Sequence, residues 1–179
     1  MVYPFHGRRL ARVMAIESIY SSELMGLPLE KTFRDVIEER RSFFERVIDN
    51  PRDHDVKTEK QLNRFRRDLE NWEQIVDFAS RIIESYSVNK EAVEKAIKEN
   101  LEGIDYDRIF NVEKSILKAA TAEMMGMDTD YKVVISEAIK IANDLSTDKA
   151  AKMINAILDR IAEYLNLKET VTETGEKTS

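Results

Sequence analysis

The sequence predicts an all-α protein, and three observations support this fold class. Only 5 glycines and 3 prolines occur among 179 residues, too few turn formers for the many short strands of a sandwich or barrel. The composition is 42% hydrophobic and 35% charged, a mixture typical of amphipathic helices with one solvated face. Apolar residues also recur at three- and four-residue steps through most of the chain, which is the spacing of one face of a helix.

The first fifty residues predict two helices. A helix over about 9–25 carries apolar side chains at helical spacing, and Gly26 is placed to end it. A second helix opens at Pro28 and runs to about residue 50. It stops there because the residue before Pro51 is pushed out of helical geometry.

A stretch over about 58–86 shows the clearest helical periodicity in the sequence. The polar segment 51–57 before it predicts a loop. Periodicity alone leaves open whether 58–86 is one helix or two helices joined near Asn71. A short helix over about 90–101 is expected next, with Gly103 at its end.

Three further helices are expected over about 112–125, 131–145 and 147–165. Gly126 closes the first of these, and Ser146 is the expected N-cap of the last. The sequence after residue 166 has no apolar periodicity, so 167–179 is expected to be a disordered tail. Because no repeat and no long linker interrupts the rest, 1–166 is expected to form a single domain of about seven helices.

The residue inventory argues against the common classes of enzyme. The chain has no cysteine, which excludes thiol nucleophiles, iron–sulfur clusters and thiolate zinc sites. Neither His6 nor His54 has the glutamate three residues earlier that helical di-iron bundles use. The glycines are isolated, so no phosphate-cradling loop is present. We therefore expect no enzymatic activity, no cofactor and no metal.

The distribution of charge bears on location and on partners. The longest stretch free of Asp, Glu, Lys and Arg is 1–7, too short for a membrane span or for a signal peptide. We therefore expect a cytoplasmic protein that does not bind a membrane. With 28 Lys and Arg against 34 Asp and Glu, the net charge is −6, which argues against indiscriminate binding to nucleic acid.

Two local groups of basic residues stand out against this acidic balance. Arg8, Arg9 and Arg12 lie in a stretch without an acidic residue at the start of the first helix. Lys149 and Lys152 share one helical face with Met153 at the start of the last helix. By themselves, such clusters are more often ordinary surface residues, and Met153 is more often core.

Four segments resemble the NusB family of transcription antitermination factors. GRRLARVMAIESIYSSEL at 7–24 is similar to the arginine-rich first helix of the family. Residues 106–162 keep three further motifs of the family in order, namely VEKSILKAATAEMM, YKVVISEAIKIA and KMINAILDRIA. The resemblance implies a noncatalytic, all-α protein of two packed helical sub-bundles, about 1–87 and 88–166. No family signature is found in 31–80.

The resemblance also implies a function. It implies an RNA-binding transcription antitermination factor that pairs with NusE, a small-subunit ribosomal protein. The pair binds boxA-type single-stranded RNA of the ribosomal RNA leader and joins the RNA polymerase antitermination complex. The arginine-rich start and the beginning of the last long helix face the RNA in this family. The implied RNA-binding residues are Arg8, Arg9, Arg12, Tyr20, Lys149, Lys152 and Met153.

Departures from the family pattern leave two alternatives open. Met153 replaces an aromatic residue, which removes a stacking platform, and Ala156 replaces a glycine. One alternative is therefore a protein-interaction module of the same fold with altered or lost RNA binding. The other, less favoured, is the accessory domain of an RNA methyltransferase, although the sequence ends before any catalytic part. In the unmatched region, Arg64, Arg66 and Arg67 could add an RNA contact, but interleaved acids make a solvated face the default.

Overall fold

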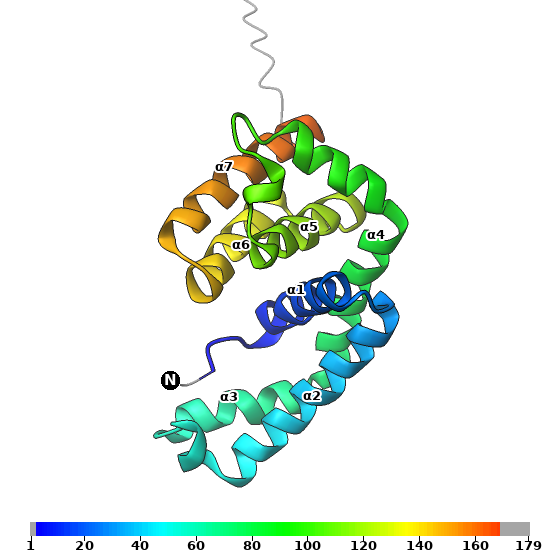
Figure 1. The fold of residues 1–179 in the computed structure, drawn as a ribbon. Helices are drawn as coiled ribbons and strands as arrows, with labels where there is room; N and C mark the ends of the chain where they lie inside the picture. The colour runs from blue at the N-terminus through cyan, green and yellow to red at the C-terminus, as the bar shows by residue number, and fades with distance from the viewer. Residues whose placement is uncertain (1–2, 169–179) are drawn as a thin grey trace, which may run out of the picture.

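The computed structural model describes residues 3–168, which form seven α-helices and no strand (Figure 1). The helices are α1 (Gly7–Met25), α2 (Leu29–Asp49), α3 (Glu59–Glu70), α4 (Trp72–Glu99), α5 (Asn111–Gly126), α6 (Tyr131–Leu145) and α7 (Asp148–Tyr164). Two short 3-10 helices, Pro51–His54 and Tyr106–Arg108, lie in the connections. The predicted all-α class is confirmed. None of the described helices is long and apolar enough to cross a membrane.

Helix α1 is the central helix of the fold. It packs against α2, α4, α5 and α6, and Figure 1 shows it between α2 and α3 on one side and α5, α6 and α7 on the other. Every side chain from residue 10 to residue 16 is buried, the charged Arg12 among them. Because neighbouring helices enclose this stretch, polar side chains of α1 reach solvent mainly near its two ends.

Helix α4 is long and kinked, and it packs on both α1 and α5. At Asn89 the backbone leaves helical values, with φ −106° and ψ 17°. The Asn89 side-chain amide donates to the carbonyl oxygen of Ser85 at 3.0 Å. The helix expected separately over about 90–101 is therefore the second half of α4. The expected helix is thus present, because two helical segments meet at the non-helical Asn89 and the second of them ends at Glu99.

The periodic stretch 58–86 divides at Asn71, between α3 and α4. Asn71 has φ −105° and ψ 21°, and its side-chain amide donates to the carbonyl oxygen of Arg67 at 2.7 Å. This bond satisfies one of the carbonyls that the last turn of α3 leaves free. At the other end of α3, Thr58 and Gln61 cap the helix reciprocally.

Local sequence signals set the ends of α1 and α7. Gly26 ends α1 in the left-handed conformation that favours glycine, with φ 65° and ψ 28°. At the start of α7 the cap is Thr147 rather than the expected Ser146. The Thr147 side chain accepts a hydrogen bond from the amide of Ala150 at 3.1 Å, which satisfies one amide of the first turn.

The predicted division into sub-bundles 1–87 and 88–166 stays a prediction, and its boundary falls inside α4. Most of the predicted tail, from residue 169 to residue 179, lies outside the described residues. Lys168 is described, and its Nζ lies 2.9 Å from a carboxylate oxygen of Asp159 on α7. Residues 167 and 168 therefore belong to the folded part of the chain.

An ion-pair network fastens the C-terminal end of α1 to α4 and α5. The buried Lys118 Nζ lies 2.5 Å from Glu23 Oε1 and 3.7 Å from Glu94 Oε1. The Tyr86 hydroxyl donates to the same Glu23 oxygen at 3.0 Å. Burial, followed by the charge of Glu23, raises the pKa of Tyr86. The C-terminal end of α1 is thereby held against α4 and α5.

Candidate nucleic-acid interface

A carboxylate from α3 holds the start of α1. The amide of Gly7 donates to Asp68 Oδ1 at 3.1 Å, and His6 Nδ1 lies 2.6 Å from Asp68 Oδ2. The ring of Phe65, one turn earlier on α3, meets the His6 ring edge-on with centroids 5.0 Å apart. Asp68 thus satisfies an amide of the first turn of α1 and lies where the helix dipole favours an anion. This contact places the arginine-rich start of α1 against α3.

The three arginines at the start of α1 occupy three different environments. Arg8 is exposed, its guanidinium carbon lies 5.2 Å from the centroid of the Phe78 ring, and it makes no ion pair with any residue from 3 to 168. Arg9 donates two hydrogen bonds, of 2.7 and 3.0 Å, to the carboxylate of Glu137 on α6. Arg12 is buried. Among the three, only Arg8 combines an exposed side chain with an unpaired charge.

The Arg9–Glu137 pair joins α1 to α6 at the surface. The hydrogen bonds from Arg9 lower the pKa of Glu137 to about 2, and Lys140 adds a further hydrogen bond at 2.9 Å. The bond to Glu137 in turn raises the pKa of Arg9, with a contribution from the charge of Asp144. The Arg9 side chain remains 31% exposed. An anion can therefore approach Arg9, but its guanidinium is already shared with a carboxylate.

Arg12 is committed to a buried ion pair. Its guanidinium donates hydrogen bonds of 2.8 and 2.7 Å to the carboxylate of Glu123 on α5, and the two side chains are 8% and 1% exposed. The Phe78 ring lies 5.1 Å from the guanidinium carbon. The geometry does not support the expected RNA contact by Arg12, because its hydrogen-bonding fork is used inside the protein. One turn into α1, the helix is already enclosed by α4 and α5.

The lysines at the start of α7 are exposed, as expected, whereas Met153 is half-buried and packs against the core. Helix α7 begins three residues after the end of α6, the helix that carries the Arg9 partner Glu137. Figure 1 shows the α6–α7 connection on the same side of the view as the start of α1. Lys149 and Lys152 thus form a second exposed basic pair at the start of α7, outside the lining of the groove at α1, while Met153 contributes mainly to packing.

A groove of about 510 Å³ opens beside the start of α1. Arg8 and Arg9 of α1 line it, together with Arg64 and Arg67 of α3 and Glu137 of α6. The structure thus brings two arginines of the unmatched region next to the basic cluster of α1. The sequence did not show this proximity, which depends on the contact of Asp68 with the start of α1.

Comparison with known proteins identifies the family to which this arrangement belongs. The NusB family model matches residues 9–163, from α1 almost to the end of α7. The chain belongs to the NusB family. A transcription antitermination protein NusB from Thermus thermophilus is 25% identical over 169 residues, which cover 94% of this chain and 99% of that protein. One from Clostridium botulinum is 28% identical over 155 residues, which cover 86% and 98%.

Solved structures share the fold of this NusB-family chain. T. maritima NusB superposes with a TM-score of 0.63 at 24% identity, over 91% of this chain and 93% of that one. A structure of the antitermination factors NusB and NusE in complex with dsRNA gives a TM-score of 0.64 at 18% identity, over 88% and 96%. The expected NusB-like fold is therefore confirmed.

Tyr20 lies apart from the basic groove of this NusB-family fold. It follows Arg8 on α1 by twelve residues, which is about 18 Å along the helix axis at 1.5 Å per residue. Its side chain is half-buried, and it does not line the groove. The structure therefore groups Arg8 and Arg9 with the arginines of α3 rather than with Tyr20.

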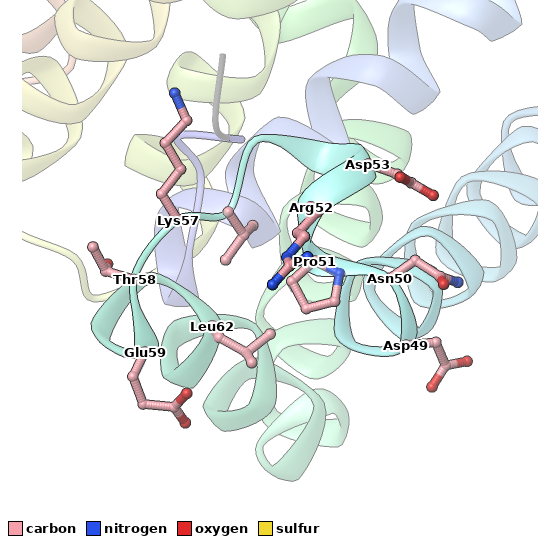
Figure 2. Close-up of a pocket in the computed structure, with 10 residues that line it drawn as sticks. Asp49, Asn50, Pro51, Arg52, Asp53, Lys57, Thr58, Glu59 and Leu62 are labelled. Carbon is pink, nitrogen blue, oxygen red and sulfur yellow. The ribbon is translucent and has the colours of Figure 1, made fainter.

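A second hollow, of about 460 Å³, lies at the connection between α2 and α3 (Figure 2). Acidic and basic side chains alternate along it, and Figure 2 shows Lys57 and Asp53 pointing away from each other. No group of three or more side chains that could hold a metal ion occurs within residues 3–168. The charges at this hollow do not converge on a common point, so the groove at α1 is the stronger candidate interface.

Proposed function

We propose that this NusB-family chain is a noncatalytic, RNA-binding transcription antitermination factor. It pairs with NusE, binds boxA-like single-stranded RNA and joins the RNA polymerase antitermination complex in the cytoplasm. Relatives named transcription antitermination proteins support the process, and the solved NusB–NusE–RNA complex supports the two partners. The structural observation that carries the proposal is Arg8, an exposed and unpaired guanidinium at the anchored start of α1.

The proposed contacts divide between two helix starts. Arg8 binds a phosphate through its planar fork, and Arg9 offers the edge of its guanidinium that Glu137 leaves free. Lys149 and Lys152 supply point charges at the start of α7. Arg12 supports the site from within, because its ion pair holds α1 against α5.

Tyr20 and Met153 take lesser roles in this proposal. The half-buried Tyr20 offers one ring face to an unpaired base. Met153 packs against the core and offers no aromatic platform. We therefore expect phosphate contacts to supply most of the affinity, with a base preference weaker than an aromatic residue at position 153 would give.

The test is fluorescence anisotropy of a labelled boxA-like single strand, titrated with the chain in the presence and in the absence of NusE. We expect binding at about 50 mM salt, and log K should fall linearly with log salt between about 50 and 200 mM. The slope reports the number of phosphates neutralised, at about 0.7 per phosphate for a single strand. Absence of binding at low salt, both with and without NusE, would contradict the proposal.

A second candidate function is a protein-interaction module that keeps the fold without the RNA site. The half-buried Met153, which packs against the core where the resemblance to the family implies an aromatic residue, favours this candidate. It predicts capture of NusE by the chain without any RNA binding. The variant Arg8→Gln/Lys152→Gln separates the two functions. If the chain is an antitermination factor, this variant should bind RNA more weakly than the wild type and NusE equally well. If the chain is a protein-interaction module, wild type and variant should bind NusE equally well, and neither should bind RNA.

A further inference from the structure

The groove beside α1 holds three cations without an anionic partner. Arg8, Arg64 and Arg67 are exposed, line the groove, and make no ion pair with any residue in the described range 3–168. Of the five other arginines on α2 and α3, three form ion pairs; Arg66 Nη1, for example, lies 2.5 Å from Glu59 Oε1. Three unpaired guanidinium groups facing one groove repel each other in the absence of a ligand, so the groove is suited to an anion.

The carboxylates of the same groove are already engaged. Asp68 accepts from the amide of Gly7 and contacts His6, and Glu137 accepts from Arg9 and Lys140. An anion that enters the groove therefore meets free guanidinium groups and no free carboxylate.

The register of α3 explains why its arginines face this groove. Phe65 and Asp68 form the face of α3 that contacts the start of α1. Arg64 and Arg67 each precede one of these residues, so they share the adjacent face at a spacing of three. The anchor that fixes α1 thereby also aligns two arginines along the edge of the groove.

A neighbouring hollow that Arg8 also lines differs in its charge. Its three arginines, Arg8, Arg67 and Arg81, are matched by three carboxylates, Asp68, Glu73 and Asp77. The groove lined by Arg64 and Arg67 therefore has the larger excess of positive charge, and it attracts a polyanion more strongly than the neighbouring hollow does.

We propose that the RNA strand bound at the start of α1 continues along the groove against α3, where Arg64 and Arg67 bind its phosphates. The inference rests on the proposed RNA binding and adds a second segment to the site, on a region without a family signature. RNA is favoured over an acidic protein segment as the ligand of this groove, because Arg8 and Arg9 line the groove and also make the proposed RNA contacts. The strand must then be longer than the segment that α1 and α7 contact.

The test compares Arg64→Gln/Arg67→Gln with the matched control Arg34→Gln/Arg46→Gln. Both variants remove two exposed positive charges that form no ion pair within the described residues, but the control pair lies on α2, outside the groove. The probes are a labelled boxA-like single strand extended at both ends and the same strand shortened from either end, each measured by anisotropy with NusE present. Thermal unfolding and NusE affinity are measured for every variant.

The groove variant is expected to bind the extended strand more weakly than the control does. For the groove variant, the plot of log K against log salt should be less steep than for the control by about 1.4, the value for two phosphate contacts on a single strand. Shortening the strand from one end, and not from the other, should remove the difference.

Three outcomes would overturn the inference. If groove variant and control bind the extended strand equally while the wild-type chain binds it, the extension along α3 is wrong and the proposed function stands. If the groove variant loses NusE affinity instead, the groove serves a protein. If the wild-type chain binds no strand at all, the proposed function fails together with the inference.

Discussion

The buried pair of Arg12 and Glu123 provides the most specific structural prediction. Substitution of Arg12 by leucine removes the cation and leaves the Glu123 carboxylate, which is 1% exposed, without its two hydrogen bonds of 2.8 and 2.7 Å. Breaking a buried ion pair from one side costs about 3–5 kcal/mol, since the remaining charge is neither solvated nor paired. We expect Arg12→Leu to lower the free energy of unfolding by about this amount.

The double variant Arg12→Leu/Glu123→Leu serves as the control. Replacing both partners of a buried pair by apolar groups of similar volume is often neutral, so the double variant should regain most of the lost stability. For a domain of this size, about 3–5 kcal/mol corresponds to a fall of about 6–20 °C in the melting temperature. The predicted order of melting temperatures is therefore wild type close to the double variant, with Arg12→Leu well below both.

Urea unfolding at neutral pH, followed by circular dichroism, measures these differences, and a double-mutant cycle isolates the coupling between the two side chains. A loss below about 1 kcal/mol for Arg12→Leu would refute the reasoning. The reasoning would also be refuted if the double variant lost as much stability as Arg12→Leu and Glu123→Leu lose together. Either result would mean that the ion pair of Arg12 and Glu123 contributes little to the stability of the fold.

Two further predictions concern the anchors of α1. Because the folded pKa of Glu137, about 2, lies below its ordinary value of 4.5, its ion pair stabilises the protein above about pH 4.5 and loses this effect as the pH falls towards 2. A pKa shift of this size corresponds to about 3 kcal/mol of folding stability, and screening by solvent reduces this contribution to about 1–2 kcal/mol. In urea unfolding below pH 4.5, the free energy of unfolding of the wild-type chain should therefore approach that of Glu137→Gln. Asp68→Ala should cost about 2 kcal/mol in the same assay, by freeing the Gly7 amide and His6; Asp77→Ala is the control.

The sequence predicts the helices well because the information for them is local. Apolar spacing and Gly26 locate most of α1, and similar signals locate α5, α6 and α7. The division at Asn71 could not be decided from spacing, since the apolar residues keep helical steps on both sides of it. The Asn71 side chain ends α3 through a hydrogen bond that leaves no trace in the periodicity.

The candidate site was predictable only in part, because its arrangement depends on contacts between distant residues. The basic character of Arg8, Arg9 and Arg12 is visible in the sequence, but the burial of Arg12 comes from Glu123, which lies 111 residues further along the chain. In the same way, Arg64 reaches the site only because α3 is anchored to the start of α1.

The measurement that tests the central claim most directly is RNA binding by a charge-reversed α1. Arg8→Glu and the control Arg34→Glu change the net charge equally, and both side chains are exposed and unpaired within residues 3–168. Anisotropy with a boxA-like single strand and NusE should show binding by the wild-type chain and by the control, and an affinity about tenfold or more lower for Arg8→Glu. Equal affinities for the two variants, or no binding by the wild-type chain at low salt, would contradict the account.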